Sequence, residues 1–352
     1  MGGADVTPPP IPLVRRFPAL ARVPRLPLGL FPTPVERLTG DRPLWVKRDD
    51  RTATRYGGNK IRALEFLLGD MQPGESLLTV GGEGSTHVMV TAAVARRLGL
   101  PMRAVRWKHE MNPEASLTAG RVRALGAELL TSPGPVRGLL RAWILKRRRG
   151  VRYIPLGGTT PMGMLGHVNA GLELAEQIQA GELPEPELLV LPLGTGGTTA
   201  GLALGLHIGG VASKILAVRV GPWVGSSRWR VRWRMGQVAR TLSRLTGEKI
   251  SLPPHGRIAI EHGWSGGAYG RAEPRARKPA EWLKDATGIR LDGTYGAKAF
   301  GAAYERAAAT TGPVLFWLTF DGRWIEESGG ASGELHITGP QAIVRPASRT
   351  PR

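Results

Sequence analysis

The sequence predicts an α/β protein built on parallel sheets, and three observations support this fold class. Short apolar runs typical of buried strands alternate with stretches whose apolar residues recur at helical spacing. The glycine-rich segments follow these strand candidates, which places them at the sheet edge where such folds bind ligands. The chain of 352 residues is long enough for two sub-domains, and it holds no uninterrupted apolar run of membrane-spanning length.

The expected elements alternate along the chain. The strand candidates are 77–80, 102–107, 151–155, 188–193, 215–220 and 314–319. Helical patterns lie between them, among others at 88–98, 117–125 and 168–178. Because strand, helix and strand repeat in this order, we expect parallel pairing with ligands at the carboxyl ends of the strands.

The two ends of the chain differ in composition from the rest. Residues 1–25 and 340–352 are rich in proline and arginine, and we expect both segments to be poorly ordered. The early prolines also break any signal-peptide core. The chain has no cysteine, so it has no disulfides, and a cytoplasmic location is expected. No metal ligand is predicted.

A turn with two glycines precedes a helix in the segment Gly57-Gly58-Asn59-Lys60. The glycines allow a sharp turn and leave room for a flat ligand beside the lysine. Lys60 stands where a helical pattern begins, and helix starts attract anions. The arrangement suits an amine that bonds covalently to a phosphorylated aldehyde, although a solvated surface lysine would give the same pattern.

A second glycine-rich loop, Gly194-Thr195-Gly196-Gly197-Thr198, follows the strand candidate 188–193 and precedes an apolar helical stretch. A strand, a glycine-rich turn and a helix together present N–H groups and hydroxyls to a phosphate. The loop lacks the Lys-Ser/Thr pair of a P-loop and the acidic residue of a dinucleotide fingerprint. It is typical of a monophosphate site, with a tight turn that binds nothing as the alternative.

With these segments the chain resembles the fold-type II pyridoxal-phosphate (PLP) enzymes, and within them the family of 1-aminocyclopropane-1-carboxylate (ACC) deaminase and D-cysteine desulfhydrase. The resemblance covers roughly residues 26–320, and its motifs occur in the family's order. They are the segments 28–38, 47–50, 57–60, 81–87, 153–167, 194–201, 268–270 and 292–298.

The resemblance implies an architecture similar to the β-subunit of tryptophan synthase, with two parallel-sheet sub-domains and PLP between them. The larger domain would comprise residues 26–65 and 181–339, and the smaller one residues 66–180. It also implies a small amino-acid substrate and a homodimer.

The resemblance further assigns residues to the cofactor. Lys60 would carry PLP covalently, and Asn59 and Thr86 would lie near its phenolic oxygen. Gly194, Thr195, Gly196, Gly197 and Thr198 would hold the phosphate. Thr319 would lie near the pyridine nitrogen, where a hydroxyl does not stabilise a protonated ring and so suits elimination better than transamination. A threonine that merely ends a strand is the alternative, because Phe320-Asp321 follows where Gly-Gly is usual.

Three residues match family positions near the substrate. Ser85 could bind the substrate carboxylate or share in proton transfer. Tyr269 and Tyr295 could act as acid, base or nucleophile, and a buried ring with a satisfied hydroxyl is the alternative for each.

The chain also departs from the family's pattern. Gly84 replaces a glutamine, Thr86 an asparagine, and Gly296 an acidic residue of ACC deaminase. Loss of that carboxylate disfavours ACC as substrate. The expected activity is therefore β-elimination and deamination of a small amino acid such as D-cysteine, with ACC deaminase or a catalytically weakened basic scaffold as alternatives.

The net charge of +20 is not explained by the family. Two stretches, 137–152 and 228–244, combine arginines with apolar residues at helical spacing. They would serve either as contacts for nucleic acid or an anionic membrane, or as ordinary surface helices that use arginine in place of lysine. The second interpretation is preferred, since no nucleic-acid motif accompanies the charge.

Overall fold

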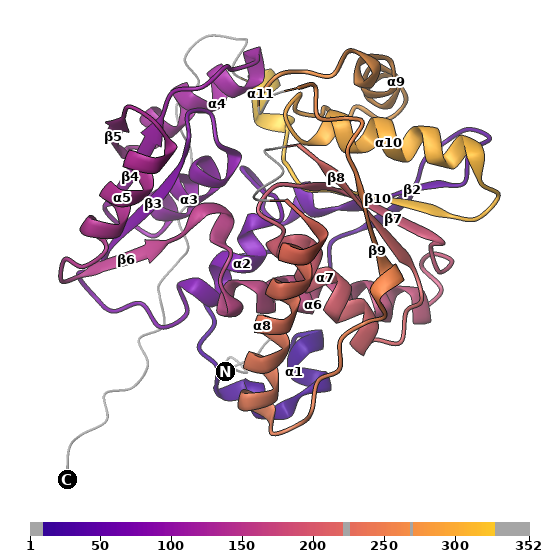
Figure 1. The fold of residues 1–352 in the computed structure, drawn as a ribbon, viewed down its shortest axis with the longest axis horizontal. Coiled ribbons are helices and arrows are strands. Elements are labelled where there is room, and N and C mark those ends of the chain that lie inside the picture. The colour runs from indigo at the N-terminus through magenta and orange to yellow at the C-terminus, as the bar shows by residue number, and fades with distance from the viewer. Residues whose placement is uncertain (1–9, 221–225, 268–269, 328–352) are drawn as a thin grey trace, which may run out of the picture.

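The computed structural model describes residues 10–220, 226–267 and 270–327, which form two sheets flanked by helices (Figure 1). The larger sheet has the strand order β1-β2-β10-β7-β8-β9, and the smaller has the order β5-β4-β3-β6. All neighbouring strands pair in parallel except β1 with β2. The predicted α/β fold class with two parallel sheets is therefore confirmed.

All six predicted strands are present, each within two residues of its expected bounds. The larger sheet contains β1 (Val35–Arg37), β2 (Leu44–Arg48), β7 (Leu188–Leu193), β8 (Lys214–Arg219), β9 (Ile258–Glu261) and β10 (Val314–Leu318). The smaller sheet contains β3 (Ser76–Gly82), β4 (Met102–Trp107), β5 (Glu128–Ser132) and β6 (Val151–Ile154). The strands β1, β2, β5 and β9 were not predicted, because they are short, lie at an edge or carry charged residues.

The helices connect the strands and cover the sheets. Their bounds are α1 (Pro12–Arg16), α2 (Lys60–Leu67), α3 (Thr86–Arg97), α4 (Pro113–Ala124), α5 (Pro135–Leu145), α6 (Pro161–Gln179), α7 (Gly197–Ile208), α8 (Arg228–Thr246), α9 (Arg277–Thr287), α10 (Gly296–Ala309) and α11 (Arg323–Glu327). The side chains of Asn112, Thr160 and Ser227 accept hydrogen bonds from the first turns of α4, α6 and α8, which explains where these helices begin. No helix among the described residues is long and apolar enough to cross a membrane.

The N-terminal expectation needs correction, because α1 and a 3₁₀ helix at Pro18–Arg22 lie within the segment 1–25. Leu13, Phe17 and Leu20 are buried there against the core of the larger sheet. The backbone N–H of Leu13 donates to the side chain of Asn169 on α6 at 2.9 Å. Apolar residues at helical spacing thus override the proline-rich composition. The tail 340–352 lies outside the described residues.

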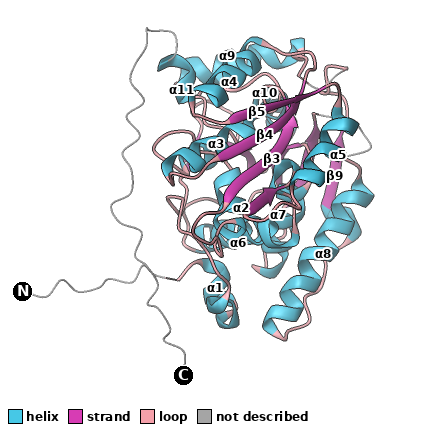
Figure 2. Ribbon diagram, turned by 90° about the vertical axis from the view of Figure 1, so that its left-hand side faces the viewer, coloured by secondary structure: helices cyan, strands magenta, loops and turns pink. Residues whose placement is uncertain are grey.

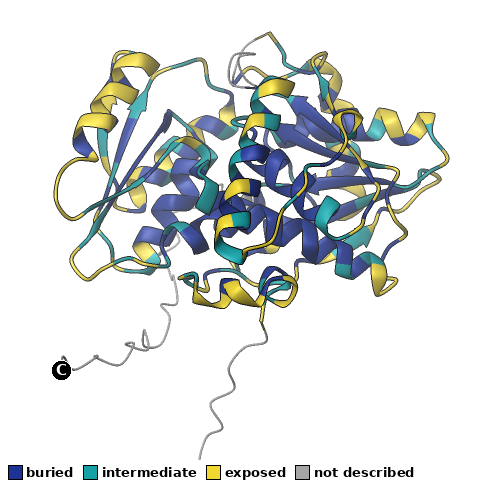
Figure 3. Ribbon diagram, turned by 60° about the horizontal axis from the view of Figure 1, so that its bottom comes forward, coloured by how far each residue is buried: buried dark blue, intermediate teal, exposed yellow. Residues whose placement is uncertain are grey.

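Buried residues are concentrated in the strands and in the helices between the two sheets (Figure 3). One core cluster joins a face of the larger sheet to α6, α7 and α8, and another joins the opposite face to α9 and α10. A third cluster packs α2, α3 and α4 on the smaller sheet.

The helices α6 and α7 pack in very close contact, since a Cβ on Gly205 would lie 2.3 Å from the carbonyl oxygen of Val168. A Cβ on Gly166 of α6 would likewise lie 1.9 Å from the carbonyl oxygen of Arg62 on α2. Helix α6 therefore lies between α2 and α7 and holds the lysine-bearing helix against the larger sheet. The division at residues 65/66 and 180/181 stays a prediction.

Candidate active site

A cavity of about 400 Å³ lies at the carboxyl ends of strands from both sheets. Gly82 and Trp107 end β3 and β4, and Gly194 and Thr319 follow β7 and β10; all four line the cavity. The other predicted site residues in its lining are Asn59, Lys60, Ser85, Thr86, Thr195, Gly196, Thr198 and Tyr295. Tyr269 lies outside the described residues. Loops that are far apart in sequence are thus brought to one place by the parallel topology.

Lys60 is the first residue of α2 and is half-buried at the cavity wall. Desolvation by the surrounding protein lowers the pKa of Lys60 to about 8. At pH 7 about a tenth of this amine is therefore uncharged, far more than for an ordinary lysine, and can act as a nucleophile or a base.

The turn before Lys60 is fastened to the end of β10. The N–H of Asn59 donates to the carbonyl oxygen of Thr319 at 3.1 Å. Gly58 has a φ of 133°, and a Cβ there would lie 2.7 Å from the same oxygen, so glycine is required. Asp321 accepts a hydrogen bond from the N–H of Gly57 at 3.1 Å. The Phe320-Asp321 pair therefore takes part in holding the lysine turn.

The glycine loop joins β7 to α7 and faces the same cavity. Gly196 adopts a φ of 84° directly before the first residue of α7, Gly197. The first N–H groups of a helix have no partner inside the helix, so this end attracts an anion. The hydroxyl of Thr199 is buried with no hydrogen-bond partner. The loop therefore fits a phosphate monoester. Gly197, which was also predicted to hold the phosphate, is buried and does not line the cavity.

The amine of Lys60 and the glycine loop lie in one cavity, and a hydrogen bond joins the residue before Lys60 to the loop. The side-chain amide of Asn59 donates to Oγ1 of Thr198 at 2.9 Å. The residues present thus fit a phosphorylated aldehyde that bonds to Lys60 at one end and to the loop 194–198 at the other.

Tyr295 and Ser85 line the cavity from different elements. Tyr295 precedes α10, and its ring lies 3.4 Å from the position of a Cβ on Gly194. Ser85 is the N-cap residue of α3, and Thr86 is the first residue of that helix. The arrangement places one phenol and two hydroxyls along the cavity that holds Lys60.

Two buried histidines near Lys60 were not predicted as site residues. Burial, together with the nearby charge of Lys60, lowers the pKa of His87 to about 3. The pKa of His167 is lowered well below its usual value by the same two causes. His87 pairs with the hydroxyl of Thr79 at 2.9 Å, and Nε2 of His167 lies 3.4 Å from Oγ1 of Thr198. Both imidazoles are thus neutral, and neither competes with Lys60 for a proton.

No pattern in the sequence marked these histidines beyond their presence in the segments 81–87 and 153–167, because a lone histidine in an apolar helix is usually a core residue. The wall formed by the smaller sheet was also missed, and it consists of Trp107, His109 and Leu156.

Two departures from the family's pattern have a local structural reason. Gly84 has a φ of 76°, and a Cβ there would lie 2.5 Å from the carbonyl oxygen of Ala115. A glutamine would therefore displace α4. At Gly296 a Cβ would lie 3.1 Å from a carboxylate oxygen of Asp292. That carboxylate accepts the N–H groups of Thr294, Tyr295 and Gly296, so a second acid there would face repulsion.

A buried ionic cluster anchors α2 below the cavity. Arg62 donates to Asp49 at 2.7 Å and to Glu173 at 2.8 Å, and Lys47 donates to Glu173 at 2.6 Å. The indole N–H of Trp317 on β10 donates to Asp49 at 2.8 Å. The motif at residues 47–50 thus serves the scaffold and is absent from the cavity lining. No group of His, Asp or Glu side chains among the described residues could hold a metal ion.

Comparison with known proteins agrees with this geometry. The family model described as "Pyridoxal-phosphate dependent enzyme" matches residues 26–319. The chain is 36% identical to nocardicin C-9' epimerase of Nocardia uniformis subsp. tsuyamanensis, over 85% of this chain and 93% of that protein. It is 31% identical to D-cysteine desulfhydrase of Klebsiella pneumoniae, over 84% of this chain and 94% of that protein.

Among solved structures, the fold is similar to that of an ACC deaminase homologue, with a TM-score of 0.72 and 29% identity over 87% of this chain and 94% of that one. With the lysine turn and the glycine loop in one cavity, these matches establish that the chain belongs to the fold-type II pyridoxal-phosphate-dependent enzymes, in the family of ACC deaminase and D-cysteine desulfhydrase.

Proposed function

We propose that the protein, with PLP as its cofactor, removes the α-proton of a small amino acid and releases a substituent from its β-carbon, with D-cysteine as the first candidate substrate. The observation that carries the proposal is the amine of Lys60, whose pKa is lowered to about 8 and which lies in one cavity with an anion-binding helix start. Bound PLP supplies an electron sink for the negative charge that develops at the α-carbon.

Lys60 would transfer the proton, and the glycine loop would bind the cofactor. Lys60 would hold the cofactor covalently, and its amine would accept the α-proton of the substrate. The loop 194–198 holds the phosphate and fixes the position of the ring. With D-cysteine, loss of the α-proton to Lys60 would be followed by cleavage of the β C–S bond, and the thiolate would take up a proton, such as the one on Lys60, and leave as hydrogen sulfide. Hydrolysis of the enamine product then gives pyruvate and ammonia.

Ser85 and Tyr295 would act on the substrate. The hydroxyl of Ser85 lies at the start of α3, where the free N–H groups of the helix also favour a carboxylate. Tyr295 lies against Gly194 and can give or take a proton on its side of the cavity. ACC is disfavoured because it has no α-proton, and because Gly296 provides no acid beside Tyr295.

Epimerisation at the α-carbon is the second candidate, and the 36% identity to nocardicin C-9' epimerase favours it. The two reactions share removal of the α-proton. They differ in the next step, since an epimerase returns the proton to the opposite face and leaves the β-carbon intact. Ser85 or Tyr295 would then have to deliver a proton opposite Lys60.

Two measurements on the holoenzyme separate these reactions. A pyruvate assay across D-cysteine, β-chloro-D-alanine, D-serine and ACC tests elimination. Proton NMR in deuterium oxide, with the same amino acids and with D-phenylglycine and L-phenylglycine, detects exchange of the α-proton without elimination. Pyruvate from the β-substituted D-amino acids supports elimination, and exchange with inversion but no pyruvate supports epimerisation. Turnover of ACC alone would contradict both elimination and epimerisation. If neither pyruvate nor exchange of the α-proton is detected with any of these compounds, a catalytically weakened scaffold would be favoured.

A further inference from the structure

The apolar residues of α5 are exposed, although their helical spacing would suit burial. The residues that α5 buries are the small Gly138 and Ala142 together with Leu145. Its larger apolar side chains face solvent, with exposed fractions of 78% for Val136, 43% for Leu139, 55% for Leu140, 45% for Trp143 and 54% for Ile144. Clustered apolar side chains of this size on one surface helix mark an interaction site.

Basic residues surround this apolar face. Residues 135–150 contain six arginines and lysines and no acidic residue. The guanidinium of Arg147 lies 3.2 Å from the ring centroid of Trp143. Helix α5 ends at Leu145, short of the predicted 137–152, and residues 146–149 continue as a basic turn closed by Gly150 with a φ of 68°.

The first two turns of α8 also combine exposed apolar side chains with basic residues. Trp229 and Trp233 are 71% and 46% exposed, and their rings stack with centroids 6.5 Å apart. Helix α8 also has no acidic residue, and four arginines alternate with apolar residues over 228–234. Burial and, to a smaller extent, the neighbouring Arg230 lower the pKa of Arg234 to about 10. The apolar stripe of α8 faces inward: Val231, Met235, Val238 and Leu242 are buried, and Leu245 is half-buried.

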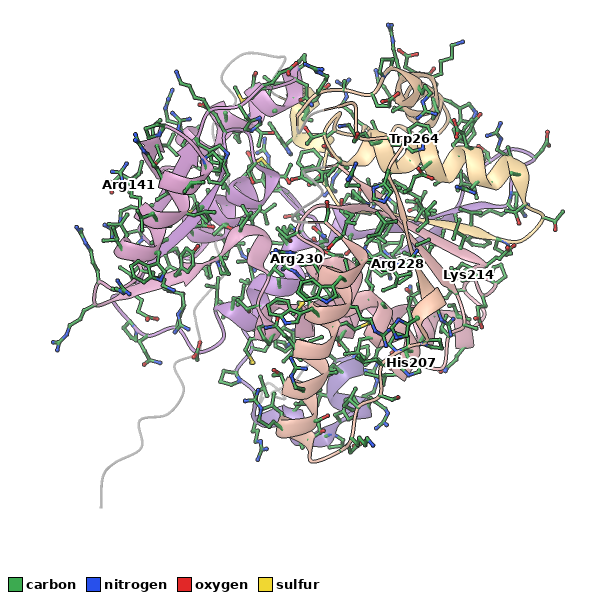
Figure 4. All side chains as sticks on the ribbon, viewed as in Figure 1. Arg141, His207, Lys214, Arg228, Arg230 and Trp264 are labelled. Atoms are coloured by element: carbon green, nitrogen blue, oxygen red, sulfur yellow. The ribbon has the colours of Figure 1, made fainter. Side chains whose placement is uncertain are left out.

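The two helices lie on the same side of the molecule, along the right-hand edge of Figure 2. Figure 4 looks onto that side of the molecule and labels Arg141 of α5 at its left margin and Arg230 of α8 near its centre. Both helices also approach the cavity. Pro135, the first residue of α5, lines it, and Val231 of α8 would lie 3.1 Å from a Cβ on Gly196. The exposed apolar and basic residues of α5, of the turn 146–149 and of α8 are called the basic face below.

We propose that the basic face docks on the surface of an anionic lipid bilayer. Exposed Trp, Leu, Ile and Val side chains flanked by arginines are the composition of helices that lie in the interface of a membrane. The arginines would contact lipid phosphates, at about 1 kcal/mol for each cation near the surface. The aliphatic side chains of α5 would enter the boundary between headgroups and acyl chains.

Charge distinguishes this partner from a second copy of the chain. A dimer in which α5 or α8 of one copy packs on α5 or α8 of the other would bring arginine against arginine, since neither helix offers a carboxylate in return. The apolar residues distinguish it from nucleic acid, because Leu139, Leu140 and Ile144 offer a phosphate backbone neither charge nor a hydrogen bond.

The test is co-sedimentation of the full-length holoenzyme with phosphatidylcholine vesicles that contain or lack phosphatidylglycerol. We expect binding only to the anionic vesicles, and weaker binding as salt is raised. The double variant Arg148→Glu/Arg149→Glu should weaken binding by about tenfold or more. The matched control Lys278→Glu/Lys284→Glu reverses the same number of charges on α9, away from the basic face, and should retain binding.

A second variant tests the apolar part of the face. Leu140→Asp/Ile144→Asp should weaken vesicle binding by a similar factor, whereas Leu117→Asp on α4, where the leucine is 44% exposed, should not. Sedimentation velocity of the same proteins checks the oligomeric state. If the α5 variant dissociates a dimer and no protein binds vesicles, the face is an interface between copies and the proposal fails. Binding to a DNA duplex without binding to vesicles, or equal vesicle binding by all variants, would also overturn it.

Discussion

The side-chain amide of Asn59 donates a hydrogen bond to Oγ1 of Thr198 at 2.9 Å, so the lysine-bearing turn is tied to the glycine loop that we propose binds the phosphate. The two residues are 139 positions apart in the chain. Because Lys60 follows Asn59 directly and Thr198 lies in the first turn of α7, this bond ties the residue before the amine to the helix start that would bind the anion. The same threonine hydroxyl lies 3.4 Å from the neutral imidazole of His167.

Replacing Thr198 by valine keeps the shape of the side chain and removes the hydroxyl. We expect PLP to dissociate about tenfold more readily, because the buried amide of Asn59 then lacks its partner at a cost of about 1–3 kcal/mol. Dialysis followed by absorbance measures the retained cofactor. Thr198→Ser restores the hydroxyl and is the control, so equal losses in both variants would contradict the role of the bond.

Replacing Lys60 by alanine should abolish turnover and remove the absorbance band of the covalently bound cofactor, since Lys60 is the one lysine among the described residues that line the cavity. Borohydride treatment of the wild-type enzyme should fix the cofactor to Lys60, and peptide mapping would locate it. Wild-type absorbance and activity in Lys60→Ala would show that the cofactor lysine lies elsewhere.

Replacing Gly196 by valine should weaken retention of PLP by an order of magnitude or more. The φ of 84° disfavours a β-branched residue, and the added atoms would press on Val231, 3.1 Å from the position of a Cβ. The control is Gly181→Ala, which also has a positive φ but meets nothing within 4 Å. Full cofactor occupancy after dialysis of Gly196→Val would rule out the loop as the phosphate site.

Sequence reasoning located the lysine turn and the glycine loop because both are local patterns. Gly58 and Gly196 need positive φ, and that requirement is visible in the residue type alone. The parallel fold followed from the apolar runs. The pairing of His167 with Thr198 could not be foreseen, because it depends on the close approach of α6 and α7 at Gly171 and Gly205.

Exposure was the second property that the sequence could not supply. The apolar spacing in 137–144 is the same whether the apolar residues face a core or solvent. Which side chains are exposed depends on the packing of the helix, which buries Gly138 and Ala142 and leaves the larger apolar residues in solvent. The segment around Leu13 and Phe17 shows the reverse case, since its proline-rich composition suggested disorder while both side chains are buried.

The rate at which the cofactor-free enzyme takes up PLP should depend on pH. Only the uncharged amine of Lys60 attacks the aldehyde, and the lowered pKa of about 8 sets its population. The rate should rise about tenfold for each pH unit below 8 and level off above it. Stopped-flow absorbance measures this profile. A rise that continues to pH 10 would show that Lys60 keeps the ordinary pKa of a lysine.

Replacing Glu173 by glutamine should destabilise the protein by about 3–5 kcal/mol, because Arg62 and Lys47 would remain buried without that carboxylate. Both cations contact Glu173, at 2.8 Å and 2.6 Å, and their charges hold the pKa of the carboxyl well below its usual range. Urea unfolding of the cofactor-free protein measures the change without a contribution from PLP.

The control for Glu173 lies on the same helix. Glu176 pairs with Arg15 at the surface, so Glu176→Gln should cost less than about 1 kcal/mol. Equal losses in the two variants would show that the buried cluster contributes no more than a surface ion pair. A large loss for Glu173→Gln alone, accompanied by weaker PLP retention, would show that the cluster holds α2 and therefore Lys60 in place, since Arg62 lies half a turn beyond that lysine on the same helix.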